Sequence, residues 1–161
     1  MRKKKNAEVA AQNVAATPEV KVPTVEEYRE YIIRAKADLD RDLTALELSA
    51  HNLKRSAKEI SDVKGIFASK ISRSKENKYG TKLEVYKIDL NEYFTLTSRV
   101  NWLTRTLASC YEGLARSQKS ARAASAQRSK CEKILANVEY KKAKIEKKLD
   151  GIVMPVVKCN Q

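Results

Sequence analysis

Residues 24–60, TVEEYREYIIRAKADLDRDLTALELSAHNLKRSAKEI, decide the fold class of this chain. Apolar side chains recur every three or four residues along this stretch, and no Gly or Pro interrupts it until Gly65. This is the period of one face of an α-helix. The apolar positions are Tyr28, Ile32, Ala35, Leu39, Leu43, Leu46, Ala50, Leu53, Ala57 and Ile60. From Leu43 onward the spacing is heptad-like, which is typical of a coiled coil.

The beginning of this helix has its own signal. Pro23 precedes Thr24, and Glu27 follows three residues later. In such a capping box the threonine hydroxyl accepts a hydrogen bond from a first-turn N–H, and the glutamate accepts one from the threonine N–H. We predict a first helix over residues 24–72 and a polar, basic loop over residues 73–80, which ends in Gly80.

A second capping box, Thr81 with Glu84, predicts a second helix over residues 82–150. No Pro occurs from residue 24 until Pro155, and Gly151 is placed as a C-terminal cap. Leu83, Tyr86, Leu90, Tyr93, Val100, Leu107, Tyr111 and Leu114 form its apolar seam. We therefore predict an all-α fold, a long antiparallel helical hairpin or coiled coil over residues 24–150. A three-helix bundle with a break near residues 115–129 is the alternative, because residues 115–130 contain no large apolar side chain.

Residues 130–150 show three stripes when placed on a helical wheel at about 100° per residue. The apolar stripe predicts an interface with a partner helix and consists of Cys131, Leu135, Val138, Ile145 and Leu149. Acidic Glu132, Glu139 and Glu146 flank it on one side, and lysines flank it on the other. Lys142 occupies an apolar position, where a polar residue sets register. Because the second helix outlasts the first by roughly 20 residues, or about 30 Å, we expect another chain to cover this stripe.

The two ends of the chain are predicted to lie outside the helical region. Residues 1–23 form a flexible basic arm with Pro18 and Pro23, and residues 151–161 form a C-terminal tail. No run of about 18 apolar residues predicts a transmembrane segment. No apolar run follows Met1–Lys5, so a secretion signal is not expected. Three widely spaced cysteines without a CxxC pair indicate a reducing compartment, such as the cytoplasm, nucleoid or nucleus, or a virion interior.

The sequence gives little support for an enzyme active site. His51 is the only histidine, and no phosphate-binding glycine loop or HExxH motif occurs. Asp38, Asp40 and Asp42 alternate with other residues and predict a solvated helix face. We therefore expect no enzyme activity, no metal and no cofactor.

Charge is the strongest functional signal. The 161-residue chain carries 33 basic and 20 acidic residues, a net charge of +13, and residues 115–150 hold 11 basic against four acidic residues. Concentrated positive charge attracts polyanions, and phosphates are contacted without base reading. The predicted nucleic-acid-binding residues are Arg2, Lys3, Lys4, Lys5, Arg116, Lys119, Arg122, Arg128, Lys130, Lys133, Lys141, Lys144 and Lys148.

These patterns predict a structural or assembly subunit without enzyme activity. It associates with other chains, of its own kind or different, through coiled-coil helices, and it binds nucleic acid without sequence preference. A virion or nucleoid component is one setting that fits. The alternatives are a scaffold or adaptor subunit with acidic protein partners, and a helical hairpin that binds membrane surfaces.

Overall fold

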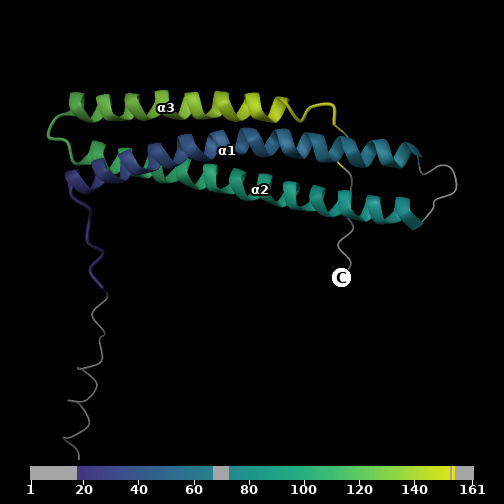
Figure 1. Cartoon of the computed structure of the whole chain (residues 1–161). Coiled ribbons are helices and arrows are strands. Elements are labelled where there is room, and N and C mark those ends of the chain that lie inside the picture. The colour runs from purple at the N-terminus through teal and green to yellow at the C-terminus, as the bar shows by residue number, and fades with distance from the viewer. Residues whose placement is uncertain (1–17, 67–72, 153, 155–161) are drawn as a thin grey trace, which may run out of the picture.

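The protein consists of three long helices that lie side by side (Figure 1). The computed structural model describes residues 18–66, 73–152 and 154, and the side chains of 62–66 and 73–77 lie outside this description. Helix α1 spans Val25–Ile66, α2 spans Arg73–Arg116 and α3 spans Ala121–Lys147. Helix α2 runs antiparallel to α1, and α3 turns back and runs parallel to α1 (Figure 1). The all-α prediction is confirmed for the described residues, as a helical bundle.

Helix α1 begins where its sequence predicts. The backbone N–H of Thr24 donates to Glu27 Oε2 at 2.7 Å, and the Glu27 N–H donates to Thr24 Oγ1 at 3.2 Å. Both bonds of the capping box are present, so two helix-start donors that the helix itself leaves unpaired are satisfied.

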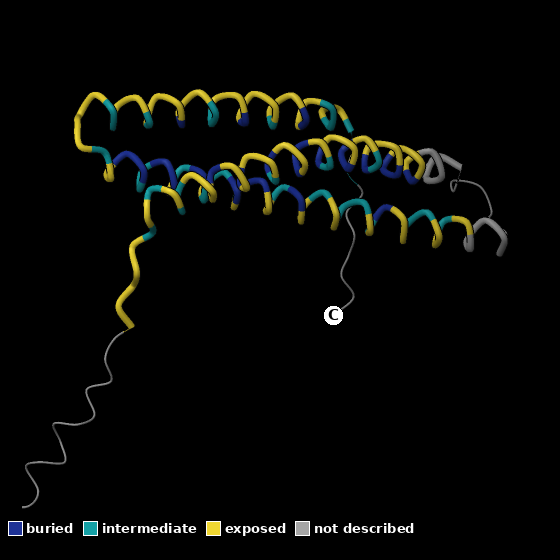
Figure 2. The backbone as a smooth tube through the Cα atoms, turned by 60° about the vertical axis from the view of Figure 1, so that its left-hand side comes forward, coloured by how far each residue is buried: buried dark blue, intermediate teal, exposed yellow. Residues whose placement is uncertain are grey.

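The core runs along the whole bundle. The inward sides of the three helices are buried and their outward sides are exposed (Figure 2). On α1, every apolar position from Ile32 to Ile60 in the predicted seam is buried, and Tyr28 is half-buried. On α2, Leu96 and Leu103 join the predicted seam in the core. The 3.6-residue period therefore identified the buried face, because burial of that face is what stabilises a helix in a protein.

Two predicted boundaries are wrong. Residues 73–80 are helical and belong to the start of α2, so Thr81 lies inside a helix instead of at its beginning. Gly80 has nothing within 4 Å of the position of a Cβ atom, and a helical glycine costs only about 1 kcal/mol, which the rest of α2 tolerates. The predicted helix 82–150 is broken at Ser117–Ser120, which makes the three-helix alternative the observed arrangement.

Side-chain hydrogen bonds, instead of a glycine, stabilise the turn between α2 and α3. Ser117 Oγ donates to the Gly113 carbonyl at 2.8 Å, and Gln118 Nε2 donates to the Leu114 carbonyl at 3.0 Å. Ser120 is the N-cap of α3, and its Oγ accepts from the Ala123 N–H at 3.1 Å. These bonds satisfy helix-end groups that would otherwise lack partners, so the turn forms without Gly or Pro.

The predicted interface with another chain is also corrected. Because α3 folds back, no helix overhangs within the described residues, and the chain's own α1 and α2 cover the apolar stripe. Cys131, Val138 and Ile145 are buried in the main core. Leu135 and Leu149 are partly buried against the same core. The stripe is therefore an intramolecular seam.

Lys142 and Asp42 are charged residues that lie beside and in the core. Lys142 Nζ donates to Asn101 Oδ1 of α2 at 2.8 Å, which ties the register of α3 to that of α2. Asp42 is only 2% exposed, so the predicted solvated face is wrong at this residue. Its carboxylate forms ion pairs with Arg99 at 3.1 Å and with Arg41 at 3.6 Å, which is how a buried charge is kept in a core.

None of the helices, over the residues that the structure describes, is long and apolar enough to span a membrane.

Candidate polyanion-binding surface

The outward side of α3 carries a group of exposed basic side chains, which we call the α3 basic face. Its members are Arg122, Lys130, Lys133, Lys141, Lys144 and Lys147, and all six are exposed. Since Cys131, Val138 and Ile145 point into the core, a turn of about 100° per residue brings these six residues to the solvent side and the α1 side. The sequence-based selection missed Lys147, although the same wheel places it beside Arg122.

The acidic residues of α3 lie on its other flank, toward α2. Burial and the nearby negative charge of Glu146 raise the pKa of Tyr93 on α2. Glu139 accepts a hydrogen bond from Lys142 at 3.4 Å beside Asn101 of α2. The separation of acidic and basic flanks predicted from the wheel is therefore present in the folded chain, and the basic flank faces outward.

Between α1 and α3, two adjoining grooves of about 370 and 340 Å³ run beside this face. Lys133 and Lys141 of α3 and Lys36 of α1 line the first groove over an apolar floor that includes Leu39 and Val138. Lys36 was not predicted as part of the surface, because nothing local in the sequence brings α1 next to α3.

Acidic residues of α1 neutralise one edge of the surface. Lys148 Nζ donates to Glu47 of α1, and this contact, together with Lys144 nearby, lowers the pKa of Glu47 below its usual 4.5. Asp40 lines both grooves. Lys148 is therefore engaged within the chain, and its contact with nucleic acid stays a prediction.

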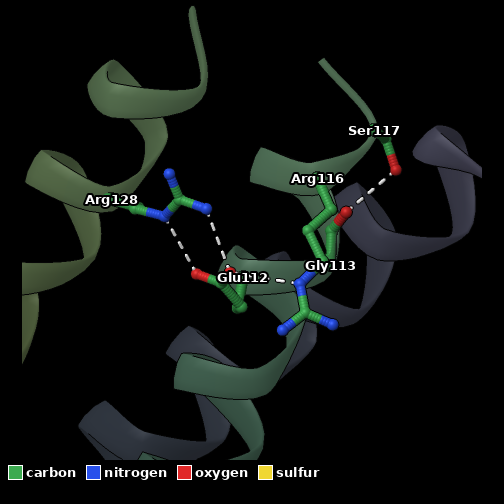
Figure 3. A network of polar contacts seen from close by, with 5 residues as sticks. All are labelled: Glu112, Gly113, Arg116, Ser117 and Arg128. Atoms are coloured by element: carbon green, nitrogen blue, oxygen red, sulfur yellow. Dashed lines mark hydrogen bonds and ion pairs between the residues drawn. The ribbon is translucent and has the colours of Figure 1, made fainter. Parts of the chain in front are cut away.

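A second ion-pair cluster engages two more of the predicted residues (Figure 3). Arg128 donates from Nε to Glu112 Oε2 and from Nη2 to Glu112 Oε1, each at 3.1 Å. Arg116 Nε donates to Glu112 Oε1 at 3.2 Å. Arg128 is the main cause of a lowered Glu112 pKa. Arg128 thus joins α3 to α2, whereas the Arg116–Glu112 pair lies within α2, and the charge of both arginines is partly neutralised.

Lys119 is exposed in the α2–α3 turn, at the end of the bundle from which the N-terminal stretch also leaves (Figure 1). Arg2, Lys3, Lys4 and Lys5 lie outside the described residues. Within the described part of the chain, no ion pair engages Lys119 or any member of the α3 basic face. Those seven side chains are therefore exposed basic groups that no ion pair among the described residues neutralises, and they share α3 and the turn before it.

The groups that would be needed for catalysis are scattered. His51 is exposed on α1, and Cys110 and Cys131 are buried, which raises the pKa of each thiol. Among the described residues, no three His, Cys, Asp or Glu side chains gather in a group that could hold a metal ion.

In comparisons with known proteins, no family model, no curated protein and no solved structure matches the chain. The functional proposal therefore rests on the chain's own residues and their geometry.

Proposed function

We propose that this protein is a structural or assembly subunit without enzyme activity, which binds nucleic acid without sequence preference through the α3 basic face and its basic arm. The observation that carries the proposal is the separation of charge on α3. Six exposed basic side chains share its outward side, while Glu132, Glu139 and Glu146 lie on the flank that faces α2. A virion or nucleoid interior is a setting that fits such a surface.

The dimensions of this face suit a phosphate backbone. Helix α3 has 27 residues, which corresponds to a length of roughly 40 Å at 1.5 Å per residue. Duplex DNA offers a negative charge about every 1.7 Å along its axis, so several lysines of one straight helix meet phosphates together. A lysine contact to a phosphate reads no base, and binding should therefore be insensitive to sequence.

The test is fluorescence anisotropy with a random-sequence duplex of about 30 base pairs, titrated with salt. Five or six phosphate contacts predict a log–log salt slope of about −4.5 to −5.4. The variant Arg122→Gln, Lys130→Gln, Lys133→Gln, Lys147→Gln should make the slope shallower by about 3.6, and it should weaken binding at least tenfold at low salt. None of the four residues forms an ion pair in the described part of the chain, so the fold should persist.

The matched control removes the same charge from the other end of the bundle. It carries Lys54→Gln, Arg55→Gln, Lys58→Gln and Lys78→Gln, all at exposed positions. The control should bind nearly as well as the wild type. Equal loss in both variants, or no binding by the wild type at low salt, would contradict the proposal. Circular dichroism of each variant shows whether the helices remain.

One observation favours a second candidate function, that of an adaptor for an acidic protein. The groove beside Lys36 and Lys133 has an apolar floor, which suits an acidic amphipathic segment better than a nucleic acid. The substitution Ile134→Ala, at a partly buried position that lines the same groove, distinguishes the two functions. It widens the floor and should weaken binding of an acidic peptide, but it leaves phosphate contacts on the outward face unchanged.

A further inference from the structure

A third groove, of about 340 Å³, opens between α1 and α2, and α3 contributes nothing to it. Tyr31, Arg34 and Asp38 of α1 and Trp102 of α2 line it, with buried Ala35 and Leu103 among its other walls. Trp102, the only tryptophan of the chain, is 59% exposed, and Tyr31 is 46% exposed. Large aromatic side chains that gather beside an open groove are a common feature of interfaces.

The two charged residues that line this groove have opposite signs, unlike the residues of the α3 basic face. Arg34 and Asp38 stand one helical turn apart on its rim. Next to them, Arg41 pairs with Asp38 at 3.0 Å, and the buried Asp42 holds both Arg41 and Arg99. A chain with a net charge of +13 repels its own copies over most of its surface, so a mixed-charge surface is where two copies can meet.

The order of these residues is self-complementary. In a two-fold dimer, residue i contacts residue j and j contacts i. A two-fold axis that passes beside α1 on the groove side, at the level of residue 36, sets Arg34 of each copy against Asp38 of the other. The same axis sets Arg41 of one copy level with Tyr31 of the other, because each lies five positions from residue 36. That pairing allows a cation–π contact, while Trp102 lies close to the axis.

We propose that two copies of this chain associate through the α1–α2 groove, antiparallel along α1, with Trp102 buried between them. This inference goes beyond the proposed function and does not depend on it. It leaves the α3 basic face of each copy exposed, so a dimer would present two such faces. It also gives the chain a surface for association with another chain, which the sequence analysis had expected at the stripe on α3.

The test uses two charge reversals, Arg34→Glu and Asp38→Arg. Each variant alone places like charges together twice across the axis, and each should be a monomer of 18.2 kDa where the wild type is a dimer. In an equimolar mixture, the two introduced side chains would meet as a glutamate and an arginine, and the two native ones as Asp38 and Arg34. The mixture should therefore form heterodimers. Sedimentation velocity at micromolar concentration measures all three samples, and Arg55→Glu, at an exposed position of α1, is the matched control and should remain a dimer.

Trp102 fluorescence gives an independent reading. Because Trp102 is the only tryptophan, its emission should shift to shorter wavelength as the concentration rises, with the same midpoint as dimerisation. A wild type that is monomeric throughout would overturn the proposal, as would single reversals that stay dimeric, or a mixture that stays monomeric. A dimer that dissolves on nuclease treatment would also overturn it, since nucleic acid would then bridge the copies. Failure of the duplex-binding test leaves these outcomes unchanged.

Discussion

Gly113 of α2 makes the closest approach between two helices that the structure records for a glycine. A Cβ atom at this position would lie 2.6 Å from Cε1 and 2.7 Å from Oη of Tyr28, in the first turns of α1. Real Cβ atoms are not found so close to another carbon or oxygen atom. The absence of a side chain at residue 113 therefore allows the half-buried tyrosine ring to lie directly on the backbone of α2.

We predict that Gly113→Ala lowers the free energy of unfolding in the wild type and raises it in the Tyr28→Ala background. Alanine gains about 1 kcal/mol over glycine in a helix, but in the wild type it must displace the Tyr28 ring. Crowding of this kind costs about 1–3 kcal/mol, so the free energy of unfolding should fall by up to about 2 kcal/mol. In the Tyr28→Ala background the same substitution should raise it by about 0.5–1 kcal/mol. Urea denaturation of the four proteins measures both, and an equal effect in the two backgrounds would refute the contact.

Only half of the role of Gly113 could be predicted from the sequence. The apolar pattern of residues 83–114 predicts that Gly113 lies inside a helix without breaking it, and Gly113 does lie inside α2. Its contact with Tyr28 depends on how α1 and α2 are aligned, which a periodic pattern leaves open. Asp42 is similar, because its burial depends on Arg99 of another helix.

At the scale of the elements, Glu112 joins α3 to α2. Its carboxylate accepts two hydrogen bonds from Arg128 of α3 and one from Arg116, and these contacts hold its pKa below 4.5. A carboxyl group with a lowered folded-state pKa stabilises the fold above its unfolded pKa. That contribution is lost as the pH falls through the folded-state value. Arg116 and Arg128 remain charged throughout this range.

We predict that Glu112→Gln removes part of the acid sensitivity of the bundle. The variant should be less stable than the wild type at pH 7, and the difference should shrink as the pH falls below 4.5. Thermal unfolding followed from about pH 7 to about pH 3 measures the effect. Glu132→Gln, at an exposed position of α3 for which the described part of the structure shows no ion pair, is the control. A constant difference between Glu112→Gln and the wild type at every pH would show that the carboxylate charge contributes nothing.

The elements also show what local patterns can predict. Residues 24–27 specify the start of α1 because a capping box is complete within four residues. The turn at Ser117–Ser120 was predicted only as an alternative, because Ser120 lacks a glutamate or glutamine three residues later, where Ala123 stands. Residues 115–130 favour helix by propensity, and the chain breaks there because α3 can then bury Cys131, Val138 and Ile145. The residues that supply this packing free energy lie outside the turn, so the sequence of the turn alone does not predict the break.

At the scale of the whole molecule, the three helices give the bundle two unlike sides. The α3 side is basic and exposes lysines, whereas the α1–α2 groove is aromatic and lined by charges of both signs. Composition alone indicated a basic protein but could not separate these sides, because residues from α1 and α2 meet only in the folded chain. A dimer through the groove would direct the basic faces away from the interface, and each proposal then uses a surface that the other leaves exposed.

The bundle is also unequal along its length. Helix α3 ends at Lys147, beside Glu47, so beyond that point no third helix packs on α1 and α2 within the described residues. There the short segment after α3 replaces it, because Ile152 and Met154 pack on a separate core of Leu53, Ala57, Ile60 and Tyr86. Two layers bury less apolar surface than three, so this end should open locally at a lower free energy than the rest.

We predict that Met154→Ala weakens this end alone. Tyr86 Oη lies 3.8 Å from Met154 Sδ, and loss of the half-buried side chain should cost about 1–2 kcal/mol of local stability. Hydrogen exchange read by mass spectrometry should become faster in residues 53–60 and 83–90, and it should stay unchanged in residues 100–115 and 131–145. Leu48→Ala, at a position that is 61% exposed, is the control and should change neither region. Equal acceleration in both regions would mean that the bundle opens only as a single cooperative unit, with no weaker end.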